Sequence, residues 1–269
     1  MPTAKINGID INYKIKGDGE PLVMIMGIAS TKSAWILQTP VLRKHFKVIT
    51  FDNRGCGESG KPSEPYSIRD MADDTAGLMD FLEIDKAHVL GVSMGGMIAQ
   101  ELAINHPDKV NRLILCCTFA KRTGIGGISS RLVDKFGYEG DYSYDDLLNM
   151  PIRNILLELQ ELAFNKKINR LFIVPLMRLW IRNQDVSGIT NQLKAIWEHD
   201  SVDRLALIKA RTLLMTGTDD KIIDSQSSEL LVKHIPGSNL VKYEGGSHAF
   251  FVEMRKRFNS EVIHFLKDE

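Results

Sequence analysis

The sequence has few cysteines, no net charge and no long hydrophobic run. Its three cysteines, Cys56, Cys116 and Cys117, are an odd number without metal-ligand spacing, so we expect free thiols in a reducing compartment. Lys plus Arg and Asp plus Glu both number 34 in 269 residues, which leaves no basic field for nucleic acid or anionic lipid. The longest apolar runs fall far short of the roughly 20 residues that span a bilayer. These features predict a cytoplasmic protein that acts on a small molecule, with neither nucleic acid nor membrane as a partner.

The sequence equally lacks the usual signals of a metal or nucleotide site. No group of histidines and cysteines has metal-ligand spacing. The turn from Gly55 to Ser59 is glycine-rich, but it has neither the lysine nor the long glycine spacing of a phosphate-binding loop. We therefore interpret it as a structural turn, and we expect no metal and no cofactor.

Short apolar runs alternate with amphipathic stretches along most of the chain, in a composition that is 43% hydrophobic and 25% charged. An alternating run at residues 9–15 predicts a half-exposed antiparallel strand. Continuous apolar runs predict buried strands at residues 21–26, 47–51, 87–92, 110–116, 212–216 and 239–243. Helical spacing predicts helices at residues 68–82, 93–105, 225–234 and 255–267. This alternation is typical of the α/β class, with a mostly parallel central sheet and helices on both of its faces.

The alternation stops between residues 119 and 207. No convincing strand pattern occurs there, whereas helical spacing is strong after Pro151, at the start of one expected helix, and after Ser187, which can cap another. The strand and helix rhythm then returns. We therefore predict one α/β core formed by residues 1–118 and 208–269, with residues 119–207 inserted as a helical cap.

The most informative motif is Gly91-Val92-Ser93-Met94-Gly95, which matches G-x-S-x-G. In such a turn a strand changes abruptly into a helix, and the strained backbone exposes the serine hydroxyl. The residues two before and two after the serine approach each other closely, so both must be small, and here both are glycine. The motif alone is weak evidence, but here it lies between an expected strand and an expected helix. We therefore interpret Ser93 as a nucleophile.

With this motif in place, the sequence resembles the α/β-hydrolase superfamily over nearly its whole length. Asp52–Ser59 resembles the D-x-R-G-x-G-x-S turn that follows the fourth strand in that superfamily, and residues 199–213 resemble the return from the cap to the seventh strand. The nearest subgroup is a cluster of capped esterases, 3-oxoadipate enol-lactonases and cofactor-free haloperoxidases. The resemblance implies the α/β-hydrolase fold with an inserted helical cap and a triad of serine, acid and histidine.

The rest of the triad follows from chemistry and from this resemblance. A serine hydroxyl needs a base, and the base needs a carboxylate to orient it. The superfamily order is serine, acid, histidine, so the acid is expected after the strand at residues 212–216, where Asp219 and Asp220 compete. In relatives with this double-acid turn the second carboxylate is catalytic, which favours Asp220. His248 lies in a glycine-lined loop after the last strand, so the predicted triad is Ser93, Asp220 and His248.

The resemblance also implies an oxyanion hole with two backbone donors. One is expected to be the amide of Met94, directly after the nucleophile. The other is expected from the loop after residues 21–26, where the superfamily usually has His-Gly-x and this chain has Met26-Gly27-Ile28, which makes the amide of Ile28 the donor. One such donor contributes about 3 kcal/mol of transition-state stabilisation. Because Met26 replaces the histidine, the groups that brace this loop are an open question.

Three residues are candidates for the substrate pocket. Leu176–Ile181 forms an apolar stripe that we interpret mainly as helix packing within the cap, with Met177 and Trp180 as the best pocket candidates. His199 lies where the cap returns to the core, and we consider it as a third.

Together these residues predict a serine hydrolase that cleaves a small carboxylic ester or lactone through an acyl-enzyme on Ser93. Three alternatives stay open on the same residues. Similar triads in capped relatives hydrolyse carbon–carbon bonds of meta-cleavage products or support cofactor-free perhydrolysis, and the fold also serves as a small-molecule receptor. The sequence does not identify the substrate, and it leaves the oligomeric state open, a homo-oligomer included.

Overall fold

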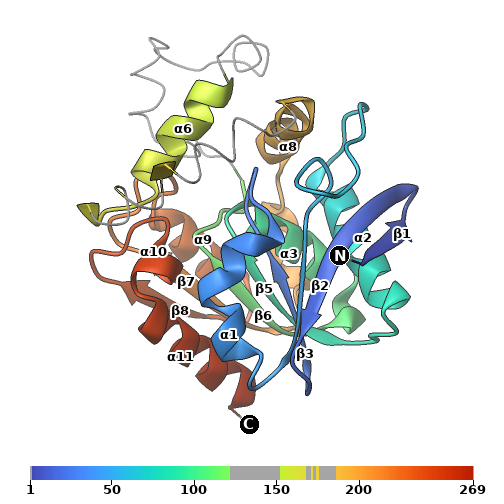
Figure 1. The fold of residues 1–269 in the computed structure, drawn as a ribbon. Coiled ribbons are helices and arrows are strands. Elements are labelled where there is room, and N and C mark those ends of the chain that lie inside the picture. The colour runs from blue at the N-terminus through green and yellow to red at the C-terminus, as the bar shows by residue number, and fades with distance from the viewer. Residues whose placement is uncertain (1, 122–151, 168–170, 172–173, 176–185, 269) are drawn as a thin grey trace.

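The computed structural model describes residues 2–121, 152–167, 171, 174–175 and 186–268. Within these residues, eight strands form one sheet in the order β1-β2-β4-β3-β5-β6-β7-β8 (Figure 1). The strands β1 (Thr3–Ile6) and β2 (Ile9–Lys16) are antiparallel to each other, and β2 is antiparallel to β4. The other six strands are parallel: β3 (Pro21–Ile25), β4 (Lys47–Phe51), β5 (Ala87–Val92), β6 (Val110–Cys116), β7 (Arg211–Gly217) and β8 (Asn239–Tyr243).

Helices cover both faces of the sheet, because side chains along the buried strands alternate between two separate cores. In β3, for example, Val23 packs in one core and Met24 in the other. One core is covered by α2 (Ile68–Phe81), α3 (Met94–Asn105) and α9 (Gln226–His234). The other is covered by α1 (Thr39–Leu42), α10 (Phe250–Glu253) and α11 (Arg255–Lys267). The predicted α/β architecture is therefore confirmed, with β1 as a strand that the sequence pattern missed.

Local sequence explains where the helices begin and end. The Ser67 hydroxyl accepts a hydrogen bond from the Asp70 amide, and the Asp70 carboxylate accepts one from the Ser67 amide, so that this capping box starts α2 at Ile68. Helix α3 ends at Asn105, two residues before Pro107, which cannot continue a helix. Short 3-10 helices occupy Lys32–Leu37, Pro107–Lys109 and Val202–Leu207.

Two described helices lie between β6 and β7 in the chain, within the segment predicted as a cap. They are α6 (Ile152–Leu162) and α8 (Val186–Glu198), and in Figure 1 both lie above the sheet. Helix α8 already includes Val186, so Ser187 lies in a helical turn and is not the cap that the sequence predicted. The stripe at Leu176–Ile181 lies outside the described residues, and the division into core and cap stays a prediction.

Candidate active site

Ser93 lies at the turn between β5 and α3. Its backbone has φ 57° and ψ −122°, a conformation that residues other than glycine rarely adopt. The neighbouring glycines make this turn possible: a Cβ on Gly91 would lie 2.2 Å from the carbonyl oxygen of Gly95, and a Cβ on Gly95 would lie 2.2 Å from that of Ile25. Neither position can hold a side chain, which is the reason for the glycine spacing of the motif.

Asp220 and His248 come from the loops after β7 and β8 and meet in a direct hydrogen bond. Nδ1 of His248 lies 2.8 Å from Oδ2 of Asp220. The other carboxylate oxygen, Oδ1, accepts the backbone N–H groups of Ile222 at 2.8 Å and Ile223 at 3.0 Å. The Asp220 side chain is fully buried and that of His248 is 12% exposed. With Nδ1 bound to the carboxylate, Nε2 is the imidazole nitrogen that is left for a substrate or a nucleophile.

Asp219, the competing acid, has different surroundings. Its side chain is exposed, and Oδ2 accepts a hydrogen bond from Nδ2 of Asn165 at 2.6 Å. Its backbone N–H donates to the carbonyl oxygen of Gly246 at 2.9 Å. The structure therefore brings Asp220, rather than Asp219, to the histidine, and it gives Asp219 a contact with the segment after α6.

Cys117 is a neighbour of this pair that the sequence interpretation missed. It follows the end of β6, it is fully buried, and its backbone has a positive φ of 39°. Its thiol donates to the carbonyl oxygen of His248 at 3.5 Å. The signal that could have found it is positional: β6 lies between the strands that carry Ser93 and Asp220. The thiol, Asp220 and His248 place ligand atoms within 4.8 Å of one another, as a metal site would, but Asp220 and His248 already bind each other.

Two opposing effects act on the protonation of His248. Burial lowers the pKa of the imidazole, but the charge and hydrogen bond of Asp220, with the neighbouring Cys117 as a further contributor, outweigh burial and raise that pKa well above its ordinary value. Burial also raises the pKa of the Cys117 thiol. Cys117 is therefore a neutral neighbour, and the charge in this cluster belongs to Asp220 and His248.

Ser93 and His248 both line one cavity of about 470 Å³, together with Ile28. The described walls are largely apolar, with Met26, Val92 and Phe251 from the core and Leu156, Leu159 and Phe164 from the segment predicted as a cap. Gly27 lets the wall approach the nucleophile, because a Cβ at this position would lie 3.1 Å from Cβ of Ser93. A cavity of this size fits a small organic molecule.

The loop after β3 is braced by groups other than the histidine that Met26 replaces. Nδ2 of Asn53 donates to the carbonyl oxygen of Met26 at 2.9 Å, and the amide of Ala29 donates to Oε1 of Gln192 at 2.9 Å. Among the residues that the structure describes, the amide of Ile28 has no hydrogen-bond partner. The same holds for the amide of Met94, which opens α3 directly after the nucleophile.

The structure does not place His199 on the cavity. Its side chain is buried, with Nδ1 3.7 Å from Oε1 of Glu101, and it is absent from the described walls. Burial lowers the pKa of His199 to about 4 against the opposing charge of Glu101. Met177 and Trp180, the other pocket candidates, lie outside the described residues.

Known proteins resemble this chain in sequence and in fold. The sequence pattern of the family described as "alpha/beta hydrolase fold" matches residues 20–254. The chain belongs to the α/β-hydrolase family. It is 28% identical to a putative carbamate hydrolase RutD of Azorhizobium caulinodans (98% of each chain covered) and 30% identical to a 2-hydroxymuconate semialdehyde hydrolase of Pseudomonas sp. strain CF600 (97% of this chain, 92% of the relative). It matches the crystal structure of the enol-lactonase from Burkholderia xenovorans LB400 with a TM-score of 0.84 and 28% identity, covering 99% of this chain and 100% of that one.

Membership of the α/β-hydrolase family supports hydrolysis as the general chemistry, since each of these relatives is named as a hydrolase or a lactonase. The names differ in the bond that is cleaved, so they do not fix a substrate. The three cysteines are buried and free, as expected. In the part of the chain that the structure describes, no helix has the length and apolar character needed to cross a membrane.

Proposed function

We propose that this protein is a serine hydrolase that cleaves a small, largely apolar carboxylic ester or lactone through an acyl-enzyme on Ser93. The observation that carries the proposal is the 2.8 Å hydrogen bond between His248 and Asp220, with this histidine and the strained Ser93 on the wall of one apolar cavity. A buried carboxylate, an oriented imidazole and a hydroxyl that a substrate can reach are the parts that acyl transfer requires.

The proposed mechanism follows from these positions. Nε2 of His248 accepts the proton of Ser93 while Oγ attacks the carbonyl carbon, and the amides of Ile28 and Met94 stabilise the oxygen that becomes negative. The resulting imidazolium is stabilised by Asp220 and gives its proton to the leaving alcohol as the carbon–oxygen bond breaks. Water, deprotonated by the same nitrogen, then attacks the acyl-enzyme, and the acid product leaves with Ser93 restored.

The walls of the cavity favour a substrate with an apolar acyl group and one neutral polar substituent. Gln160 of α6 is buried and lines the cavity, and nothing among the described residues hydrogen-bonds its Oε1. A buried amide oxygen without a partner costs free energy that a hydrogen-bond donor of a ligand can recover. No lysine or arginine occurs among the described wall residues, so apart from His248 these walls offer no cationic partner to an anionic substrate.

The proposal is tested by hydrolysis of p-nitrophenyl esters from acetate to octanoate, with Ser93→Ala beside the wild type. We expect turnover that disappears in Ser93→Ala while the variant keeps the wild-type melting temperature. The chain-length optimum then reports the depth of the cavity. Near-wild-type turnover in Ser93→Ala would exclude Ser93 as the nucleophile.

Three further measurements separate the alternatives. If the protein hydrolyses none of the esters but cleaves a dienoate meta-cleavage product in a Ser93-dependent reaction, it is a carbon–carbon hydrolase. Peracid formation from acetate and peroxide indicates perhydrolysis. Ligand-dependent thermal stabilisation with negligible turnover indicates a receptor.

A further inference from the structure

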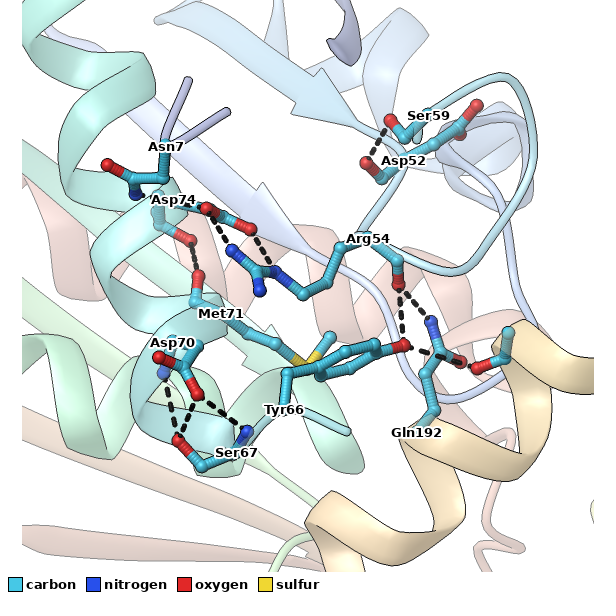
Figure 2. Close-up of polar contacts among 12 residues, drawn as sticks. Asn7, Asp52, Arg54, Ser59, Tyr66, Ser67, Asp70, Met71, Asp74 and Gln192 are labelled. Carbon is cyan, nitrogen blue, oxygen red and sulfur yellow. Dashed lines mark hydrogen bonds and ion pairs between the residues drawn. The ribbon is translucent and has the colours of Figure 1, made fainter. Parts of the chain in front are cut away.

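Gln192 of helix α8 connects the predicted cap to the loop beside the nucleophile. The residue is fully buried, and both ends of its side-chain amide are in use. Its Oε1 accepts the backbone N–H of Ala29 at 2.9 Å. Its Nε2 donates to the carbonyl oxygen of Arg54 at 2.8 Å (Figure 2). A donor and an acceptor therefore fix the orientation of this amide. A flipped side chain would place its NH₂ group against the Ala29 N–H and its oxygen against the Arg54 carbonyl oxygen.

The carbonyl group that Gln192 binds is itself held in place. The guanidinium of Arg54 forms two hydrogen bonds to Asp74 of α2, at 2.5 and 2.6 Å, and lies over the ring of Tyr66, 5.2 Å from its centre (Figure 2). The Tyr66 hydroxyl lies 3.3 Å from the same Arg54 carbonyl oxygen and 3.2 Å from that of Gly188 in α8. Gln192 is thus anchored to a part of the core that further hydrogen bonds hold in place.

Helix α8 also rests directly on the core main chain. A Cβ on Gly188 would lie 2.2 Å from the carbonyl oxygen of Gly55, so the two backbones are in contact. Asn191, next to Gln192, is buried too, and its Nδ2 lies 3.2 to 3.3 Å from the carbonyl oxygens of residues 62–64. Two adjacent amides therefore dock the same helix, but in the described contacts only Gln192 reaches the loop beside Ser93.

Ala29 is a sensitive point in that loop. Its φ of 51° lies in the left-handed region, which costs a residue with a side chain free energy unless its surroundings hold it there. The bond from its amide to Gln192 is such a restraint. It also directs the Ala29 amide away from the role of oxyanion donor and leaves that of Ile28, the preceding residue, for the cavity.

We propose that Gln192 is a positioning residue for the oxyanion hole. By holding the Ala29 amide it keeps the Ile28 amide directed at the oxygen that becomes negative when Ser93 attacks, and it takes over the bracing of a loop in which Met26 replaces the usual histidine. The inference rests on the proposed function. It also makes the oxyanion hole depend on the docking of α8, because the brace comes from that helix.

The test compares Gln192→Leu with the matched control Asn191→Leu, using kcat and KM for a p-nitrophenyl ester. Loss of one oxyanion donor lowers kcat about 10²- to 10³-fold. A donor that is displaced rather than removed is expected to cost about ten-fold or more in Gln192→Leu, with KM within about two-fold. The affinity for an alkyl trifluoromethyl ketone, which forms a tetrahedral oxyanion on Ser93, is expected to fall by the same factor as kcat. Asn191→Leu is expected to lower the melting temperature but to keep kcat within about two-fold of the wild type.

A second variant keeps the proposal testable if Gln192→Leu does not fold. A buried carboxyl group tends to keep its proton, so in Gln192→Glu it can still accept from Ala29 and donate to Arg54. We expect near-wild-type kcat in this variant at neutral pH and a loss at high pH that the wild type lacks. A kcat for Gln192→Leu equal to that of Asn191→Leu, or an unchanged pH profile in Gln192→Glu, would overturn the inference alone. Absence of any Ser93-dependent reaction in the wild type would overturn the proposed function and the inference with it.

Discussion

At the scale of single residues, the proposed site depends on how burial and charge compete at His248. A buried histidine without a partner would lose its proton easily, because burial disfavours the charged form. Asp220 reverses the balance: its carboxylate accepts two backbone N–H groups at one oxygen and the imidazole N–H at the other. The outcome is a histidine whose pKa is raised, so its neutral form, which a general base needs, is populated only above the ordinary titration range.

This balance predicts a specific pH dependence. We expect kcat/KM of the wild type to rise with pH and to level off above the pH at which an ordinary histidine titrates. In Asp220→Asn the raising charge is removed and burial remains, so the acid limb should move to lower pH, while the plateau falls by about 10⁴-fold, as in other triads. Asp219→Asn is the matched control, and its acid limb should coincide with that of the wild type. If the acid limb of the pH profile moves in Asp219→Asn and not in Asp220→Asn, Asp219 rather than Asp220 is the catalytic acid.

Sequence reasoning reaches some of these residues and not others, for a physical reason. Ser93 and His248 have local signals, namely a glycine-spaced turn and a glycine-lined loop after a strand. The choice of Asp220 over Asp219 needed the resemblance to relatives, and the structure places Asp220 at the histidine. Cys117 and Gln192 carry no local signal, because their contacts join segments far apart in the chain, 163 positions apart for Gln192 and Ala29.

At the scale of elements, the turn after β4 holds the loop after β3. Asp52 accepts the backbone N–H of Lys32 at 2.8 Å and its ammonium group at 2.7 Å, and it also accepts the amide of Glu58 at 3.0 Å. The Lys32 and Asp52 side chains are 4% and 1% exposed. A Cβ on Gly57 would lie 2.3 Å from Oδ2 of Asp52, so the turn closes tightly around the carboxylate. The D-x-R-G-x-G-x-S motif is thus a structural clamp, as expected from its lack of a phosphate-loop lysine.

The clamp predicts an effect on stability. Lys32→Met leaves a buried carboxylate without its counter-ion, and breaking a buried pair in this way costs about 3–5 kcal/mol of the free energy of unfolding. The matched control is Lys5→Met, since the Lys5–Asp10 pair is exposed and such pairs contribute about 0–1 kcal/mol. Urea unfolding of both variants beside the wild type measures the difference. Equal losses in the two variants would mean that the Lys32–Asp52 pair adds little to stability.

At the scale of the whole molecule, the parallel sheet brings the site residues together at the carboxyl-terminal ends of its strands. The strands β5, β6, β7 and β8 are neighbours, so the residues that follow their carboxyl ends gather together. Sequence periodicity predicts this part well, because a strand buried between two helical layers is apolar on both faces. It predicts the cap less well: helical spacing indicates α6 and α8, but which side chain faces the cavity depends on how each helix packs on a distant core.

The last prediction concerns Gln160, which lines the cavity between the sheet domain and the segment predicted as a cap. If its buried amide hydrogen-bonds a polar substituent of the substrate, Gln160→Leu should raise kcat/KM for p-nitrophenyl hexanoate. It should lower kcat/KM for the p-nitrophenyl hydroxyhexanoate whose hydroxyl position the wild type prefers. One hydrogen bond contributes about 0.5–1.5 kcal/mol, or about two- to ten-fold in kcat/KM. Leu156→Met, on the same helix and the same wall, keeps an apolar side chain of similar volume. It should leave the ratio of kcat/KM for the two esters unchanged. If Gln160→Leu alters both substrates by the same factor, the amide shapes the cavity without recognising a polar group, and the substrate of this hydrolase is apolar along its whole acyl chain.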